Sequence, residues 1–220
     1  MKKEVKINFI IAGALFLLFA IFTVLVMTVN VAPIGPESSE VGLSAINKAV
    51  HGALGTSELW YNVSEILGFV PLLVIPCFAV AGLVQLIKRK SLFKVDSSVL
   101  LLGAFYITVA VFYVVFEIFV VNYRPILEDG VLEASYPSSH TMLACCVMIS
   151  GIFAFYSLVK NKIARVIVLV ASITVSTLTV ATRLLSGVHW LTDIAGGILL
   201  SAALLMLYAS FLSLFRSKKK

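Results

Sequence analysis

Charged residues are scarce in this sequence, and their scarcity excludes most classes of soluble protein. Only 13% of the 220 residues are charged, whereas 60% are hydrophobic. A soluble domain carries about 25% charged residues, so this chain lacks the polar surface that such a domain shows to water. The same composition excludes a disordered chain. The three cysteines, Cys77, Cys145 and Cys146, lie in apolar runs without metal-ligand spacing, which favours packing roles.

Long apolar runs are what the sequence has instead. A bilayer-spanning helix needs about 20 mostly apolar residues, and a segment in lipid must satisfy its own backbone polar groups. The sequence therefore predicts an all-α polytopic membrane protein, a single domain over residues 1–220 with six transmembrane helices in one bundle. The predicted spans are approximately 7–29, 63–87, 98–121, 140–159, 166–182 and 190–215.

The basic residues lie between the apolar runs, which favours a role in membrane topology over nucleic-acid binding. Both termini and the connections after the second and fourth spans hold 14 of the 17 Lys and Arg residues. Basic connections stay in the cytoplasm, so segments 30–62, 122–139 and 183–189 are expected to face outward. Residues 30–62 are expected to include a helix lying in the membrane interface. The expected location is a cell membrane, with a bacterial inner membrane preferred.

Ionisable residues gather at the outward ends of the spans, where burial makes them costly and therefore suggests function. These candidate residues are Glu117, Arg124, His140, Arg183, His189 and Asp193. Pro137-Ser138-Ser139 precedes His140 and is typical of a helix start, whose free N–H groups attract anions. Taken singly, the features have simpler interpretations, such as an interfacial arginine anchor, a plain helix cap or a structural His–Asp pair.

His189 and Asp193 are four residues apart, which on a helix places both on one face. A carboxylate behind an imidazole fixes its tautomer and stabilises the imidazolium. Two guanidiniums, a helix start and a second imidazole would complete a site for phosphoryl transfer through a phosphohistidine. The sequence shows no metal-ligand set, so metal-independent chemistry without a cofactor is expected.

Three motifs resemble those of the type 2 phosphatidic acid phosphatase family of membrane lipid phosphatases. The family pattern Ser-Arg-x5-His-x3-Asp corresponds to Thr182-Arg183 followed by His189 and Asp193. The pattern Pro-Ser-Gly-His corresponds to residues 137–140, and Lys-x6-Arg-Pro corresponds to residues 117–125. Motif order, motif spacing and the six-span layout all agree with the family.

The resemblance implies a role for each site residue. His189 would be the nucleophile, Asp193 its orienting carboxylate, and His140 the acid that protonates the leaving group. Phosphate would be bound by the remaining motif residues, namely Arg124, Arg183, Ser138 and the backbone N–H of Ser139. The implied partners are the bilayer and a membrane lipid phosphate, such as phosphatidate, phosphatidylglycerophosphate or a polyprenyl diphosphate like undecaprenyl diphosphate. The oligomeric state is left open.

The sequence departs from the family in three places. Thr182 keeps the hydroxyl of serine, and Ser139 replaces a glycine. Glu117 stands where the family has lysine, and on a continuous helix it would lie nearly under Arg124, about 10 Å deeper. Three explanations are open for Glu117: it is protonated in an apolar setting, it pairs with Arg124 or Arg183, or it tunes the choice of substrate.

The favoured hypothesis is a hydrolase that removes phosphate from a lipid at the outer face of the membrane. The first alternative is a lipid phosphotransferase, which would use the same histidine and pass the phosphoryl group to an acceptor alcohol. The second alternative is a non-catalytic binder or transporter of lipid phosphates, which the altered first motif alone favours.

Overall fold

The computed structural model describes residues 3–218, and over that range the protein is built of helices without a β-strand. Six of the helices are long and apolar enough to cross a membrane, which confirms the predicted fold class. The α-helices are α1 (Lys3–Thr28), α2 (Ser44–Leu54), α3 (Glu58–Arg89), α4 (Ser97–Ile118), α5 (Ser139–Leu158), α6 (Lys162–Leu185) and α7 (Leu191–Lys218). Two 3-10 turns, η1 (Pro36–Ser38) and η2 (Leu92–Lys94), lie in the connections.

Local sequence signals account for where several helices begin. Ser57, Ser138 and Asn161 precede α3, α5 and α6, and each side-chain oxygen accepts a hydrogen bond from the backbone N–H three residues later. Such caps satisfy backbone donors that a helix start leaves free. The Ser138 cap supports the prediction of a helix start before His140.

The third predicted span runs past the end of its helix, because α4 ends at Ile118 rather than near residue 121. Arg124 therefore does not continue that helix, and it lies in the irregular segment 119–138. Glu117 is in the last turn of α4, so the expected stacking of Glu117 beneath Arg124 along one helix is wrong. A proline after Arg124 disfavours helix, but the chain had already left the helical conformation six residues earlier.

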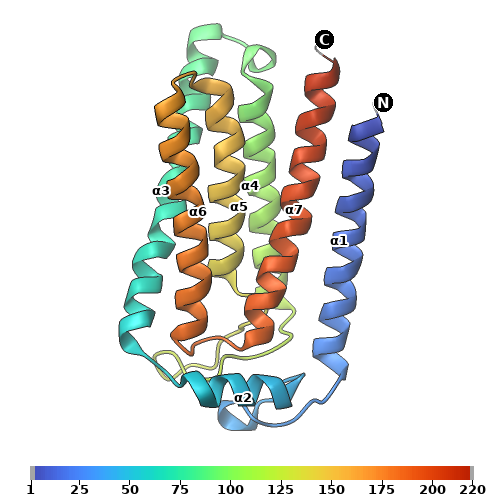
Figure 1. The fold of residues 1–220 in the computed structure, drawn as a ribbon, viewed down its shortest axis with the longest axis vertical. Helices are drawn as coiled ribbons and strands as arrows, with labels where there is room; N and C mark the ends of the chain where they lie inside the picture. The colour runs from blue at the N-terminus through green and yellow to red at the C-terminus, as the bar shows by residue number, and fades with distance from the viewer. Residues whose placement is uncertain (1–2, 219–220) are drawn as a thin grey trace.

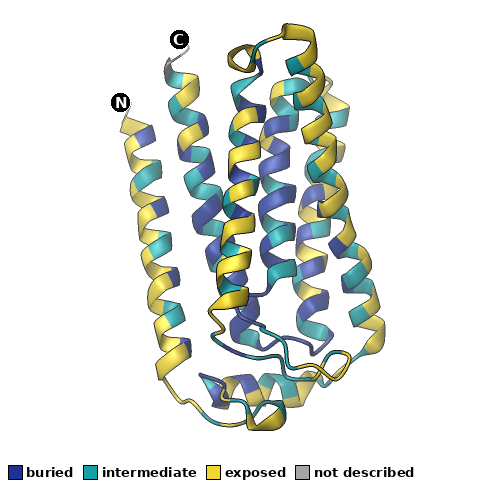
Figure 2. Cartoon of the chain, turned by 180° about the vertical axis from the view of Figure 1, so that it is seen from behind, coloured by how far each residue is buried: buried dark blue, intermediate teal, exposed yellow. Residues whose placement is uncertain are grey.

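Helix α5 occupies the centre of the bundle. It packs against α3, α4, α6 and α7. In its most apolar 18-residue stretch 56% of the residues are buried, against 11% in the corresponding stretch of α3. The other spanning helices bury one face and expose the other (Figure 2). The exposed faces carry many large apolar side chains. Exposed Ile, Leu and Phe residues on helices of this length are typical of surfaces that contact lipid.

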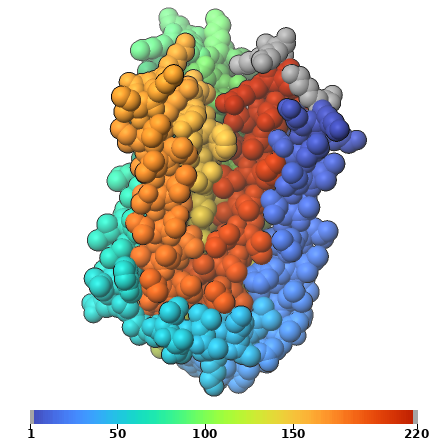
Figure 3. Space-filling view, in the orientation of Figure 1, coloured from blue at the N-terminus to red at the C-terminus, as the bar shows by residue number. Residues whose placement is uncertain are grey.

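Helices α1 and α7 pack side by side and run in opposite directions, so the two described ends of the chain lie at the same end of the bundle (Figure 1). At the opposite end, α2 lies across the bundle and covers it (Figures 1 and 3). This helix occupies part of the segment 30–62, and its position in the membrane interface stays a prediction.

Gly42 fastens this covering segment to the bundle. Its N–H donates to Asn122 Oδ1 at 3.3 Å, and its carbonyl accepts from Asn47 Nδ2 at 2.9 Å. A Cβ added at this position would lie 1.4 Å from the carbonyl oxygen of Val26 in α1. Backbone rather than a flexible side chain fills the space, so no larger residue fits without moving α1.

We expect Gly42→Ala to destabilise the protein by about 3 kcal/mol or more, because overpacking against backbone leaves no easy relaxation. Thermal unfolding in detergent should show a clear fall in the midpoint. Gly52→Ala is the matched control, since a Cβ at this α2 position meets nothing within 4 Å. It should leave the midpoint unchanged or raise it, because alanine favours helix over glycine. Equal midpoints for the two variants would contradict this account.

Candidate active site

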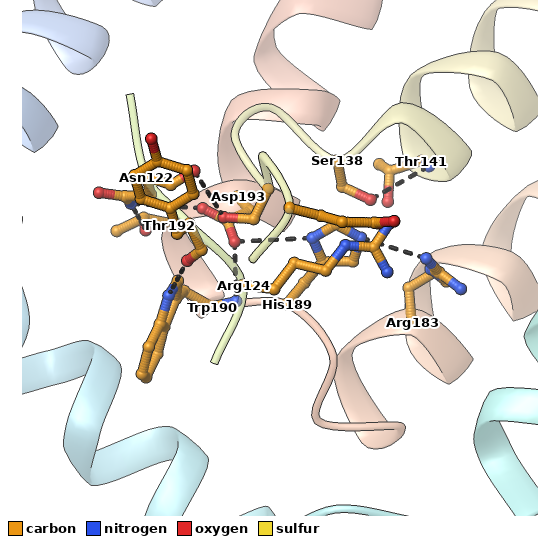
Figure 4. Close-up of polar contacts among 12 residues, drawn as sticks. Asn122, Arg124, Ser138, Thr141, Arg183, His189, Trp190, Thr192 and Asp193 are labelled. Carbon is orange, nitrogen blue, oxygen red and sulfur yellow. Dashed lines mark hydrogen bonds and ion pairs between the residues drawn. The ribbon is translucent and has the colours of Figure 1, made fainter. Parts of the chain in front are cut away.

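The predicted site residues meet at the end of the bundle that α2 covers. They come from the segment 119–138, the first turn of α5, the end of α6 and the start of α7. Figure 4 shows Arg124, Arg183, His189 and Asp193 around one small volume, with Ser138 at its edge. Segments far apart in the sequence thus supply a single cluster, as the motif order led us to expect.

His189 and Asp193 are close together, although not through helical spacing. His189 lies before α7, which begins at Leu191, and its Nδ1 is 3.6 Å from Asp193 Oδ2. The same carboxylate oxygen accepts a 2.9 Å hydrogen bond from the N–H of Trp190. Asp193 therefore caps the start of α7 in the manner of an acidic residue in a capping box, and this turn brings the imidazole to the carboxylate.

The other imidazole nitrogen of His189 faces Arg183. His189 Nε2 is 3.3 Å from Arg183 Nη2, and a guanidinium can only donate. Nε2 is therefore the acceptor, and the proton of the neutral ring lies on Nδ1, toward Asp193. Complete burial and the guanidiniums of Arg183 and Arg124 lower the pKa of His189 well below its ordinary value. The result is a neutral imidazole with a lone pair at Nε2.

Arg183 is held by α3, which the sequence had not implicated. Its side chain is 0% exposed, and its Nη1 donates to Glu65 Oε1 at 2.6 Å and to Ser64 Oγ at 3.1 Å. His140 Nε2 is 3.5 Å from the same Glu65 oxygen. Glu65 is thus a site residue that our sequence analysis missed. The available signal was an ionisable residue inside an apolar span.

Arg124 pairs with two carboxylates in its own segment. Its guanidinium forms ion pairs with Glu128 and, at 3.1 Å, with Glu133. Because Arg183 pairs with Glu65, neither arginine uses Glu117 as its partner. The pairing explanation for Glu117 is therefore not the arrangement in this structure.

Asparagine side chains support the start of α7 from two directions. Asn47 of α2 donates to Thr192 Oγ1 at 2.9 Å and accepts from the N–H of Thr192 at 3.2 Å. Asn122 Nδ2 is 3.4 Å from both Thr192 Oγ1 and Asp193 Oδ1. Both asparagines are buried. This network orients Asp193, and no sequence spacing pointed to it.

Buried polar atoms without a hydrogen-bond partner concentrate at the site. Among the described residues, five of the seven such side-chain atoms belong to it. They are Arg124 Nε, His140 Nδ1, Thr141 Oγ1, Arg183 Nε and His189 Nδ1. Buried polar groups normally have partners. His189 Nδ1 faces Asp193 at 3.6 Å, and the other four atoms leave the cluster with unused capacity for a polar ligand.

Two cavities share His140 and Ser139 as lining residues. One, of about 420 Å³, is lined mainly by apolar residues of α3, α4 and α5, including Gly68, Leu72 and Val109. The other, of about 460 Å³, is lined by Glu117, Arg124 and Glu133, among others. Glu117 thus faces the site without pairing with its arginines. In the described part of the chain, no three His, Cys, Asp or Glu side chains are grouped to hold a metal ion.

Fold and site together define a six-span membrane protein with a buried centre of arginine, histidine and carboxylate groups. A profile of the PAP2 superfamily matches residues 99–216, and the chain belongs to this superfamily of type 2 phosphatidic acid phosphatases. This confirms the resemblance that the motifs indicated.

The fold is also similar to a crystal structure described as the first transmembrane PAP2 type phosphatidylglycerolphosphate phosphatase from Bacillus subtilis. The TM-score is 0.62 and the sequence identity 21%, over 92% of this chain and 96% of that one. At this identity the likeness concerns the fold. A search of curated proteins found no match.

The lowered pKa of His189 predicts a specific loss of stability in acid. In the unfolded chain a histidine has a pKa of about 6.5, so below that pH the unfolded state binds a proton that the folded state resists. Stability is therefore full above pH ~6.5 and falls as the pH drops toward the folded pKa. Thermal unfolding midpoints from pH 7.5 to 5 should fall less for His189→Gln than for the wild type. Parallel curves would contradict the lowered pKa.

Proposed function

We propose that the protein is an integral-membrane lipid phosphate phosphatase that works through a phosphohistidine. The observation that carries the proposal is the setting of His189, whose Nε2 faces Arg183 while its Nδ1 faces Asp193. A neutral imidazole with its proton held toward a carboxylate is the form of histidine that can attack phosphorus. Membership of the PAP2 superfamily supports the same chemistry.

The proposed reaction has two steps. In the first, the bond from His189 Nε2 to phosphorus forms as the bond from phosphorus to the leaving oxygen breaks, and His140 gives that oxygen its proton. In the second, His140 takes a proton from water, the water oxygen attacks phosphorus, and the N–P bond breaks to release phosphate. Asp193 stabilises the positive charge on His189 during both steps.

The phosphoryl oxygens would be bound by the two guanidiniums and by the start of α5. Arg183 and Arg124 supply charge-assisted donors, and Ser138 and the N–H of Ser139 add the anion-binding end of a helix. For Arg124 this requires release from Glu128 and Glu133, both of which are more exposed than Arg124 itself. Neither step uses a metal ion or a cofactor.

The substrate class follows from the cavities and the family. The largely apolar cavity of about 420 Å³ is lined by His140 among its few polar residues, so a hydrophobic chain could lie there with its phosphate near His140. We propose phosphatidate, phosphatidylglycerophosphate or a polyprenyl diphosphate such as undecaprenyl diphosphate. The similar Bacillus subtilis structure is a phosphatidylglycerolphosphate phosphatase, which adds support to the second of these.

We further propose that the site faces outward from a cell membrane, with a bacterial inner membrane preferred. The site lies at the end of the bundle opposite the two chain ends (Figure 1). Most of the lysine and arginine residues belong to the segments at the end that holds the termini. The positive-inside rule then assigns the termini to the cytoplasm and the site to the other side.

The phosphotransferase alternative keeps some support from Glu117, which lines the polar cavity beside His140. A carboxylate there could accept a hydrogen bond from an acceptor alcohol. Oxygen-18 water separates the two reactions: a hydrolase incorporates one solvent oxygen into each phosphate released, whereas a transferase produces a new phosphorylated lipid.

The first prediction of the proposal is that His189→Ala abolishes phosphate release. The detergent-purified protein would be assayed in EDTA against phosphatidate, lysophosphatidate, phosphatidylglycerophosphate and a polyprenyl diphosphate. We expect turnover of at least one lipid by the wild type and a loss of at least about 1,000-fold in the variant, because the nucleophile is gone. An unchanged rate in folded His189→Ala protein would exclude the phosphohistidine. No turnover of any lipid by the wild type would count against a phosphatase.

A second prediction concerns Glu117→Lys, which restores the residue typical of the family. A cation in the cavity that holds Arg124 and His140 should bind phosphoryl oxygens, and one such contact can lower KM about tenfold. Glu117→Gln is the control that removes the charge without adding one. We expect lower KM values on simple lipid phosphates for Glu117→Lys than for Glu117→Gln. Loss of activity in both folded variants would instead show that the carboxylate is essential.

A further inference from the structure

Glu65 is placed to do more than neutralise an arginine. Its Oε1 lies 2.6 Å from Arg183 Nη1 and 3.5 Å from His140 Nε2. These are two of the groups that the proposed reaction needs on the phosphoryl group. Glu65 belongs to α3, outside the segment 99–216 that matches the superfamily. Its carboxylate therefore occupies part of the volume that a bound phosphate would take.

The empty site needs such a carboxylate. The Arg183 side chain is 0% exposed, and a buried guanidinium without a counter-charge is strongly destabilising. Glu65 supplies that charge while no substrate is bound. A phosphate dianion would supply it equally well, and it would repel Glu65 from the same position.

Glu65 is not enclosed on all sides. Its side chain is 35% exposed, and it lines the largely apolar cavity together with Gly68 and Leu72 of the same helix. Gly68 lets the ring of His140 approach α3, since a Cβ there would lie 2.7 Å from His140 Cδ2. The α3 face that carries Glu65 is thus the face against which a substrate chain would pack.

We propose that Glu65 is an exchangeable counter-ion that excludes free inorganic phosphate from the site, an inference that rests on the proposed phosphatase function. A phosphate that binds Arg183 Nη1 and His140 Nε2 must displace Glu65 from both atoms. A lipid phosphate offsets this cost by burying its chain in the apolar cavity, whereas inorganic phosphate has no chain to bury. After hydrolysis the return of Glu65 to Arg183 expels the phosphate product.

The test is the affinity of the full-length protein for inorganic phosphate, measured by isothermal titration calorimetry in detergent. Glu65→Gln should bind phosphate at least about tenfold more tightly than the wild type, because a like charge beside the anion is removed. Glu58→Gln makes the same change at an exposed position in the first turn of α3. That control should bind phosphate as the wild type does.

A second assay compares a lipid phosphate with inorganic phosphate, by testing inorganic phosphate as an inhibitor of lipid hydrolysis. With the lipid that the wild type hydrolyses, inorganic phosphate should become a product inhibitor of Glu65→Gln at concentrations about tenfold lower than for the wild type. Saturating phosphate should also raise the unfolding midpoint of Glu65→Gln more than that of the wild type, since the anion replaces the missing charge. If the Glu65–Arg183 ion pair were purely structural, Glu65→Gln would lower the unfolding midpoint equally with and without phosphate.

Glu65→Asp covers the case in which Glu65→Gln does not fold. It keeps the charge but shortens the side chain, so it holds Arg183 less well and should also bind phosphate more tightly than the wild type. Unchanged or weaker phosphate binding in the folded variants would overturn the proposal, even if the wild type hydrolyses lipid phosphate. No turnover by the wild type, together with no phosphate binding by the folded Glu65 variants, would overturn the proposed function and the counter-ion role together.

Discussion

The guanidinium of Arg183 is the constraint on which the rest of the site depends. It is fully buried at one end of a membrane bundle, where an unpaired positive charge is costly. Three groups surround it: Glu65 and Ser64 from α3 and the imidazole of His189. These contacts determine which nitrogen of His189 is free of its proton and how closely α3 must approach α6. The electrostatic need of one side chain thereby organises three segments.

The half of the chain that matches the superfamily is not sufficient for this arrangement. Residues 99–216 contain the motif residues, but Asn47 of α2 holds the backbone at Thr192, and Glu65 of α3 balances Arg183. Gly42 joins α2 to Asn122, which also contacts Asp193. The first hundred residues therefore act as a second layer that positions the motif residues, in addition to supplying two spans.

Much of this could be predicted from the sequence, for identifiable reasons. Apolar length alone locates six spans, because a bilayer accepts only segments of that size. Motif spacing brought Arg183, His189 and Asp193 together, although His189 reaches Asp193 through a capping turn rather than a helix. The relation of Glu117 to Arg124 was wrong because α4 ends at Ile118. Asn47 was missed because it acts through tertiary contacts, which leave no periodic trace in a single sequence. Glu65 left one signal, an ionisable residue inside an apolar span, but its partner Arg183 could not be read from the sequence.

The two cavities that share His140 as a lining residue have a consequence for how the products leave. One is apolar and lies among α3, α4 and α5, and the other is lined by Glu117, Arg124 and Glu133. Under the proposed function, hydrolysis would yield a lipid product that partitions into the bilayer and a phosphate that partitions into water. Each product then has its own exit, and partition into two different phases keeps them from recombining. The two products would then leave in different directions, and no movement larger than that of a side chain would be needed.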